Sequence, residues 1–572
     1  MSDEVILCRW SKRLPLTDVQ DPLGLGLRGS TRLASLLLHC ITSITPRARY
    51  YSFIPWCVRD YRSRERGRPG DLGLREAIVR RERALTLGCV VHHGGQPCVG
   101  GGLVGVLEAQ RWFGEDRNDV DLGRIRLSTV PAVDAYFNSI VNLGCILTDD
   151  ERPDVDEETE FTFDDVELSP LGERLADAYG SLIDPLPAVR KSAHLPHRCT
   201  ADELAAWGRT GGLCELSAVA EADRGMLRDI FFDRYERRGR SHDFRRKSLL
   251  LTLAFCREFS SAGWRFGEAE FAAAVYFGEA VSADADRFTP IVPESLADIA
   301  DRWRMFYFHH YMSVGLEGMF SWLLGELDAL ELGGGTIEGL AATLDSPALT
   351  RAFGELTAWE AGESFGAVTT ADLLPRESET DRSQLVALSQ SFDAAITSEH
   401  PLAEDRLERS VREGKFAHAG LGLAVPLVLL AVTLVRFARW FDTGVGRWLA
   451  GVATDRYLDL VPPVLLADLA RDHGTWWELP MRQLAERILG RYVVLHHRAM
   501  AYEKSKSGGR CLLQIDGRRL VGAGRYDRIG LGNPRLRSAT RILIDLNLLA
   551  ETDGEIAPTS EGLRLEREEL NA

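Results

Sequence analysis

The chain has 572 residues, of which 45% are hydrophobic, and its 68 basic and 84 acidic residues give a net charge of −16. This apolar fraction, together with 53 glycines and 23 prolines, excludes a wholly disordered or low-complexity chain and suffices for several domains with cores of their own. The acidic total argues against a nucleic-acid-binding protein only if the charge is spread evenly, because such proteins are basic where they contact their ligand.

The first residues predict an intracellular location. Asp3 and Glu4 precede a short apolar run that lacks the basic and hydrophobic regions of a secretory signal. The ten cysteines include no C-x-x-C pair, so we expect free thiols and a cytoplasmic protein. One apolar stretch, residues 419–435, is at the lower length limit for a membrane span and contains Pro426. We therefore expect a buried core helix there and no membrane contact.

Helical periodicity dominates along the chain. It predicts an N-terminal helical region over 1–190 with a winged-helix-like end, a helical middle domain over 191–400, and a helical region over 401–572 with a C-terminal winged-helix-like module. A helix is expected to start at Thr45-Pro46 and to end or kink at Pro55. The longest helical pattern, 296–330, reads as one helix or as two broken near Gly315 to Gly318. A hairpin is expected around Asp516-Gly517.

An internal echo supports the two small modules. Residues 131–175 and 533–563 share one order: a helix, a tight turn, a hydrophobic pair, a hairpin, and then Ser or Thr followed by Gly at the start of a last helix. This order is typical of the end of a winged-helix module, although a hairpin that follows a helix by coincidence would look the same. The predicted fold class is mainly α and multidomain, with small α+β winged-helix-like modules.

The charge is distributed unevenly. Residues 1–86 carry a net charge of +7 and residues 498–541 carry +8, whereas residues 149–184 carry −12. The acidic segment lies in the first echo, which we expect to repel DNA and to serve structure or protein contact. Arginines of the two basic segments can pair with phosphates or guanine edges, or can form a solvated surface balanced by acids elsewhere. The predicted nucleic-acid-binding residues are Arg518, Arg519, Arg525, Arg528, Arg535, Arg537, Arg541, Arg47 and Arg49.

Catalytic and metal-binding patterns are weak. No lysine stands in a P-loop, and a G-x-G-x-x-G run at Gly24 follows no predicted strand. Asp405, Glu413 and Lys415 resemble the spacing of a metal-dependent nuclease, but on a predicted helix. A cluster of possible zinc ligands lacks a second cluster at the usual spacing: Cys89, His92, His93 and Cys98. We therefore predict no catalytic residue, no cofactor and no metal site.

The N-terminal segment resembles a known group of proteins. Arg47, Arg49, Tyr50, Phe53 and the Pro55-Trp56 pair form an Arg-x-Arg-Tyr-x-x-Phe-x-Pro-Trp run, and Gly102-Leu103-Val104-Gly105 follows. This is similar to the opening of uncharacterised prokaryotic proteins that are often encoded beside restriction and phage-defence genes. The likeness covers about the first hundred residues and implies a defence setting, with other defence-system proteins as partners, but no residue role.

Together these patterns predict a non-catalytic nucleic-acid-binding component of a prokaryotic defence or restriction-type system, with DNA as its partner. Two alternatives remain. A protein-interaction scaffold without nucleic-acid contact would use the aromatic helix around Trp303 to Trp322 and the acidic segment 149–184. A metal-dependent nuclease of an unrecognised type would use Glu413 and Lys415.

Overall fold

The computed structural model divides the chain into two compact units. The mid-chain unit comprises residues 1–31, 281–286 and 305–532, and the N/C unit comprises residues 32–280, 287–304 and 533–572. The boundaries expected near residues 190 and 400 therefore fall inside the N/C unit and inside the mid-chain unit. The structure describes residues 25–571 except 97–100, 115–118, 148–165, 191–197, 215, 217–220, 236–239, 283, 331–333, 361, 374–383, 454–464, 466, 470, 472–473, 504–510, 524–528 and 530–531.

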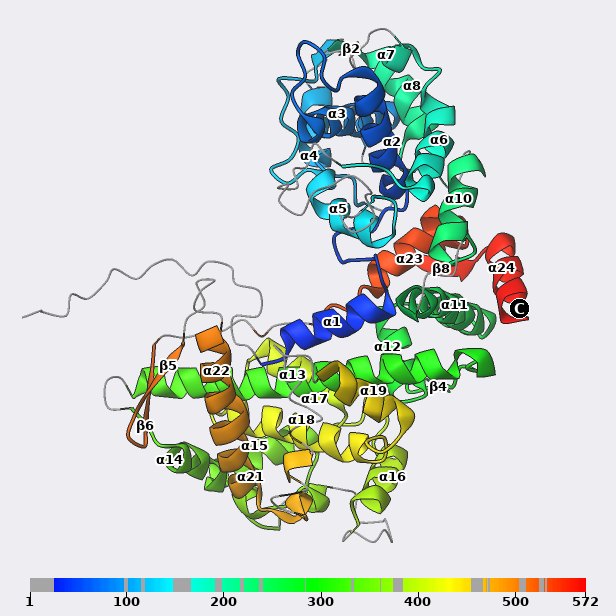
Figure 1. The fold of residues 1–572 in the computed structure, drawn as a ribbon. Coiled ribbons are helices and arrows are strands. Elements are labelled where there is room, and N and C mark those ends of the chain that lie inside the picture. Colours follow the sequence, from blue (N-terminus) through cyan, green and yellow to red (C-terminus); the bar gives the residue numbers. More distant parts are fainter. Residues whose placement is uncertain are drawn as a thin grey trace, which may run out of the picture. The chain divides into compact units, whose positions relative to one another are not determined.

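Within these residues the chain is mainly helical, and its strands form two-stranded sheets (Figure 1). The helices of the N/C unit are α1 (Leu27–Leu37, shared with the mid-chain unit), α2 (Tyr50–Arg64), α3 (Leu74–His92), α4 (Val106–Gly114), α5 (Ala132–Asn142), α6 (Pro170–Ile183), α7 (Pro187–Arg190), α8 (Ala201–Gly211), α10 (Glu221–Phe231), α11 (Arg240–Ser261), α12 (Glu268–Tyr276), α23 (Leu536–Asp545) and α24 (Ser560–Leu570). The strands are β1 (Asp119–Asp121), β2 (Arg198–Thr200), β3 (Ala280–Val281), β4 (Arg287–Phe288), β7 (Leu549–Thr552) and β8 (Glu555–Pro558).

The mid-chain unit is also built mainly from helices. Helix α13 (Ala297–Ala329) belongs to it from Met305 onward. The other elements are α14 (Ile337–Ala341), α15 (Pro347–Thr357), α16 (Leu385–Ala395), α17 (Glu404–Glu413), α18 (Leu421–Ala438), α19 (Gly444–Ala453), α21 (Met481–Arg487), a π-helix (Ile488–Leu495), α22 (His496–Glu503), β5 (Leu513–Asp516) and β6 (Arg519–Gly522).

Helices α3 and α8 approach each other closely in the N/C unit because each has a glycine at their crossing. A Cβ on Gly208 would lie 2.1 Å from the carbonyl oxygen of Gly88, and a Cβ on Gly88 would lie 2.7 Å from the carbonyl oxygen of Leu204. Nearby, the rings of Trp56 in α2 and Trp207 in α8 meet edge to face at 5.8 Å. This close crossing places the aromatic face of α2 at the centre of the core.

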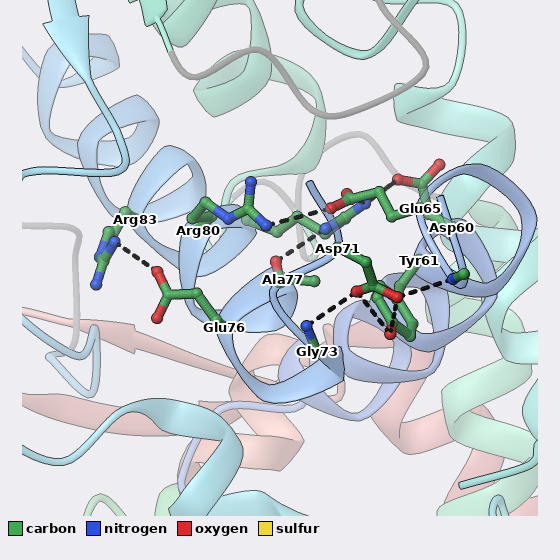
Figure 2. A network of polar contacts seen from close by, with 11 residues as sticks. Asp60, Tyr61, Glu65, Asp71, Gly73, Glu76, Ala77, Arg80 and Arg83 are labelled. Carbon is green, nitrogen blue, oxygen red and sulfur yellow. Dashed lines mark hydrogen bonds and ion pairs between the residues drawn. The ribbon is translucent and has the colours of Figure 1, made fainter. Parts of the chain in front are cut away.

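Four buried charges join α2 to α3 (Figure 2). Arg81 donates to Asp60 and to Glu65, both at 2.6 Å, and Arg80 donates to Glu65 at 3.2 Å. These side chains are at most 5% exposed. Helix α2 begins at Tyr50, four residues after the predicted start, and continues through Pro55 instead of ending there. The four buried charges at the contact of α2 with α3 depend on one another, since removing one would leave an unpaired charge in the interior, which is costly.

The echo predicted from the sequence is present in the structure of the N/C unit. After α5, the Ser169 hydroxyl donates to the Gly144 carbonyl at 2.6 Å and accepts from the Gly172 amide at 3.1 Å. After α23, the Thr559 hydroxyl donates to the Asn547 carbonyl at 2.7 Å and accepts from the Gly562 amide at 3.0 Å. The two segments therefore close the same turn with the same bonds.

Backbone geometry extends this match. Gly144 and Asn547 both have positive φ, at 76° and 59°, where glycine and asparagine are favoured. A Cβ on Gly172 would lie 2.0 Å from a carbonyl oxygen of the turn, and a Cβ on Gly562 would lie 2.0 Å from the corresponding oxygen. Between turn and cap, the second copy forms the β7–β8 hairpin, whereas the first shows an isolated antiparallel bridge between Ile146 and Leu168. The rest of the hairpin predicted for the first copy, and with it most of the acidic segment 149–184, lies outside the described residues.

Helix α13 is a single helix, and the break considered near Gly315 and Gly318 does not occur. A Cβ on Gly315 would lie 3.1 Å from the carbonyl oxygen of Pro426 in α18, and one on Gly318 would lie 2.9 Å from the Pro426 ring. The two glycines thus serve close packing of α18 onto α13. The most apolar helix of the described chain, α18, has a mean hydropathy of 2.3 over 18 residues and is 94% buried there. It could cross a membrane by length and composition alone, and its burial is that of a core helix.

The hairpin expected around Asp516-Gly517 is confirmed in the mid-chain unit. Strands β5 and β6 are antiparallel with Asp516 opposite Arg519, and Gly517 has a φ of +60° in the turn. Leu520 of β6 exchanges two backbone hydrogen bonds with Gly335, at 3.0 and 2.7 Å. This bridge anchors the hairpin to its unit and leaves its tip exposed.

Candidate nucleic-acid interface

Arg47 and Arg49 lie in the interior of the N/C unit. Arg47 is 0% exposed and donates to Asp545 at 2.9 Å and to the Gly101 carbonyl at 2.8 Å. Arg49 is also 0% exposed and donates to Asp223 at 3.0 Å and to the Gly212 carbonyl. Their carboxylate partners come from distant parts of the sequence. Neither guanidinium reaches the surface in this structure, so neither arginine belongs to the candidate interface.

Arg535 is buried as well, and it shapes the start of α23. It has a positive φ of 61° at the N-cap position and is 9% exposed. Its guanidinium donates to the Ile41 carbonyl at 2.8 Å and to the Ser35 hydroxyl at 2.7 Å. Burial lowers the pKa of this side chain below the usual arginine value. Arg535 therefore holds α23 against the segment that follows α1.

Arg537 and Arg541 lie on the open face of α23, as the four-residue spacing predicts. Arg537 is exposed, and no carboxylate pairs with it among the residues that the structure describes. Arg541 has a 12% exposed side chain and pairs with Asp545 at 3.6 Å and with Glu551 at 3.4 Å. The two arginines thus differ: the first extends into solvent, whereas acids on both sides orient the second.

Arg518 and Arg519 are exposed at the turn of the β5–β6 hairpin in the mid-chain unit. The sequence interpretation made this hairpin the wing next to α23. The hairpin that follows α23 in the N/C unit is instead β7–β8, so the two arginine pairs belong to different units. Arg525 and Arg528 lie outside the described residues.

A cleft of about 670 Å³ opens along α23, within the N/C unit. Its α23 wall contains Arg537, Arg541 and Ile544. Pro46, the Gly101–Gly102 loop, Glu268 and Glu551 also line the cleft. We call this feature the α23 cleft.

Buried charges hold the walls of the α23 cleft in place. The carboxylate of Asp545 accepts from Arg47 at 2.9 Å and from the Ala48 amide at 3.0 Å, and it pairs with Arg541 at 3.6 Å. Arg47 in turn fixes the loop through the Gly101 carbonyl. A Cβ on Gly102 would lie 2.9 Å from the Arg47 side chain, so only glycine allows this approach. Sequence reasoning missed Asp545, because a single acid at a helix end gives no signal of its partners.

The residues considered for metal-dependent chemistry do not converge. Asp405 and Glu413 lie at opposite ends of α17, about 12 Å apart along its axis at 1.5 Å per residue. Two ligands of one ion lie much closer than this. His93 contacts Cys214 at 2.8 Å, while Cys98 lies outside the described residues. Within those residues, no group of three or more His, Cys, Asp or Glu side chains could hold a metal ion.

The aromatic helix considered as a partner-docking surface is largely used by the protein's own core. Trp303, Phe306 and Phe320 of α13 are 0% exposed, and Tyr307 and Tyr311 are 5% exposed. Trp303 also donates to the Ser248 hydroxyl at 3.0 Å within the N/C unit. These rings are therefore not free to bind another protein in this structure.

Comparisons with known proteins give no relative: no family model, no curated protein and no solved structure matches the chain. The proposed function therefore depends on the geometry of this chain and on the resemblance of its N-terminal segment.

Proposed function

We propose that the protein is a non-catalytic component that binds nucleic acid through arginines of two surfaces, one in each unit. One surface is the open face of α23, with Arg537 and Arg541, and the other is the β5–β6 turn, with Arg518 and Arg519. The N-terminal resemblance suggests a prokaryotic defence or restriction-type system as the setting. The module from α23 to α24 is proposed to be of the winged-helix type, with β7–β8 as its wing.

The observation that carries this proposal is the exposure of Arg537 and Arg518. Neither has a carboxylate partner within the described part of the chain, although the protein as a whole is acidic. An exposed guanidinium without an acid is available for bidentate contact with a phosphate. Arg541 adds a second cation one helical turn from Arg537.

The test is binding of the full chain to a fluorescein-labelled oligonucleotide, measured by anisotropy over a range of salt concentrations. Arg537→Glu should weaken binding at low salt by tenfold or more and reduce the slope of log K against log salt by about 0.7 to 0.9, as the loss of one phosphate contact does. The new Glu precedes Arg541 by four residues and can pair with it, so the melting temperature should not fall.

Arg209→Glu is the matched control, because Arg209 is an exposed arginine of the same unit that lies in the last turn of α8, outside the α23 cleft, and pairs with no carboxylate among the described residues. It makes the same charge change and should leave binding nearly unchanged. Arg541→Glu is unsuitable, since it would put a third carboxylate beside Asp545 and Glu551. Absence of binding by the wild-type chain, or equal loss in both charge reversals, would refute the proposal.

A further inference from the structure

We propose that the α23 cleft binds one unpaired nucleotide, so that the protein selects single-stranded nucleic acid over duplex. The inference rests on the proposed function and names the ligand form for the α23 surface. Four observations support it: the shape of the helix surface, the chemistry of the lining, the support behind the walls, and the size of the cleft.

The shape of the surface disfavours a duplex. Reading a major groove requires a helix that projects into a channel about 12 Å wide and 8.5 Å deep. Helix α23 is sunk into its unit instead. Its apolar residues other than Ile544 are at most 1% exposed, and Ser538, Thr540 and Asp545 are also buried. Within α23, Arg537 is exposed and Arg541 and Ile544 are partly exposed, and these three residues line the α23 cleft.

The lining matches the parts of a nucleotide. Arg537 and Arg541 can bind a phosphate. Ile544 of α23 and Ile556 of β8 offer apolar surface for the face of a base. The carboxylates of Glu268 and Glu551 are acceptors for amino groups such as cytosine N4, and they would repel the second phosphate strand of a duplex. Thymine has no amino group, so this arrangement predicts a preference for cytosine over thymine.

The cleft is also preformed. Asp545 and Glu551 hold the Arg541 guanidinium from two sides, and the buried Arg47 holds the glycine loop. Groups that are already oriented lose less conformational entropy on binding. The volume of about 670 Å³ lies within the range of small-molecule sites and has room for one base with its sugar and phosphate.

The experiment compares the full chain and its variants on a labelled 12-residue single strand and on the duplex of the same sequence. The wild type should bind the single strand at least tenfold more tightly than the duplex, and an all-dC strand at least threefold more tightly than an all-dT strand. Cytidine monophosphate should displace the strand at millimolar concentration, whereas inorganic phosphate at equal ionic strength should not.

Two variants separate the base contact from the phosphate contact. Ile544→Ser should reduce the preference for single strand threefold or more while leaving the salt slope unchanged. Arg537→Ala should reduce the salt slope by about 0.7. Arg209→Ala, outside the cleft, should change neither quantity.

The outcomes distinguish the two proposals. If no oligonucleotide binds, the proposed function fails and this inference fails with it. If oligonucleotides bind and Arg537→Glu weakens them, but duplex binds as tightly as single strand or Ile544→Ser leaves the preference intact, the proposed function stands and the nucleotide cleft is refuted.

Discussion

The two glycines of the echo provide a direct test of the internal repeat. Alanine at Gly562 or at Gly172 would place a methyl group 2.0 Å from a backbone carbonyl oxygen, although real Cβ atoms essentially never come within 3.0 Å of such an atom. The first turn of each helix, or the carbonyl, would have to move by about 1 Å to restore a distance of 3.0 Å. Overpacking of this severity costs about 3 kcal/mol, and the better helix propensity of alanine returns about 1 kcal/mol. Each variant should therefore lose about 2 kcal/mol.

The assay is urea unfolding followed by far-UV circular dichroism, and Gly225→Ala is the matched control. Gly225 lies inside α10 of the same unit, and a Cβ there would meet nothing within 4 Å. Its replacement should stabilise the protein by up to about 1 kcal/mol. Similar losses at Gly562 and Gly172 would support one shared turn geometry. A neutral or stabilising effect at either glycine, like that at Gly225, would contradict the structural equivalence of the two turns.

Two further predictions concern buried charges of the N/C unit. Arg81→Met should cost about 3–5 kcal/mol of unfolding free energy, because it leaves Asp60 and Glu65 buried without their main partner, whereas Arg62→Met, at a half-exposed pair, should cost at most about 1 kcal/mol. Denaturant titrations of both variants measure this difference, and equal losses would contradict it. Burial raises the pKa of Glu82 to about 7, above its usual 4.5, although backbone amides that donate to it oppose the shift. Folding therefore favours the protonated form of Glu82. The contribution of this group to the free energy of unfolding is complete below pH 4.5 and is lost as the pH rises through 7. Glu82→Gln should remove this decline, so unchanged pH dependence between pH 4.5 and 7.5 would contradict the assignment.

The local turns could be predicted from the sequence because their signals are local. The Asp516-Gly517 hairpin depends on a glycine with positive φ, and the echo depends on hydroxyl caps and glycines a few residues apart. Helix α18 was also recognisable as a core element, since its residues are apolar all round. The sequence pattern was misleading where glycines serve the packing of two helices. Gly315 and Gly318 look like helix breakers in the sequence, yet in the structure they let α18 pack closely against α13.

The candidate site was predicted only in part, because the sequence shows where arginines are but not which acids they meet. Arg537 and Arg541 were placed correctly on one helix face. Arg47 looked equally suitable in its basic segment, but its partner, Asp545, lies almost 500 residues away in the chain. The prediction that the hairpin of Arg518 is the wing next to α23 was wrong for the same reason. The hairpin and the helix are close in sequence, but they belong to different units.

Because buried arginines pair with acids that are distant in the sequence, the net charge of a basic segment has to be interpreted differently. In the described part of residues 1–86, which carry a net +7, several arginines pair with acids from other segments, including Asp223, Asp184 and Asp545. A guanidinium tolerates this arrangement well, because its planar fork satisfies one carboxylate while its other N–H groups reach backbone carbonyls, as Arg49 does with Gly212. Segment charge therefore overstates the charge that a ligand would meet. The useful quantity is the number of exposed arginines that no acid neutralises, and among the predicted residues that the structure describes this criterion selects Arg518 and Arg537.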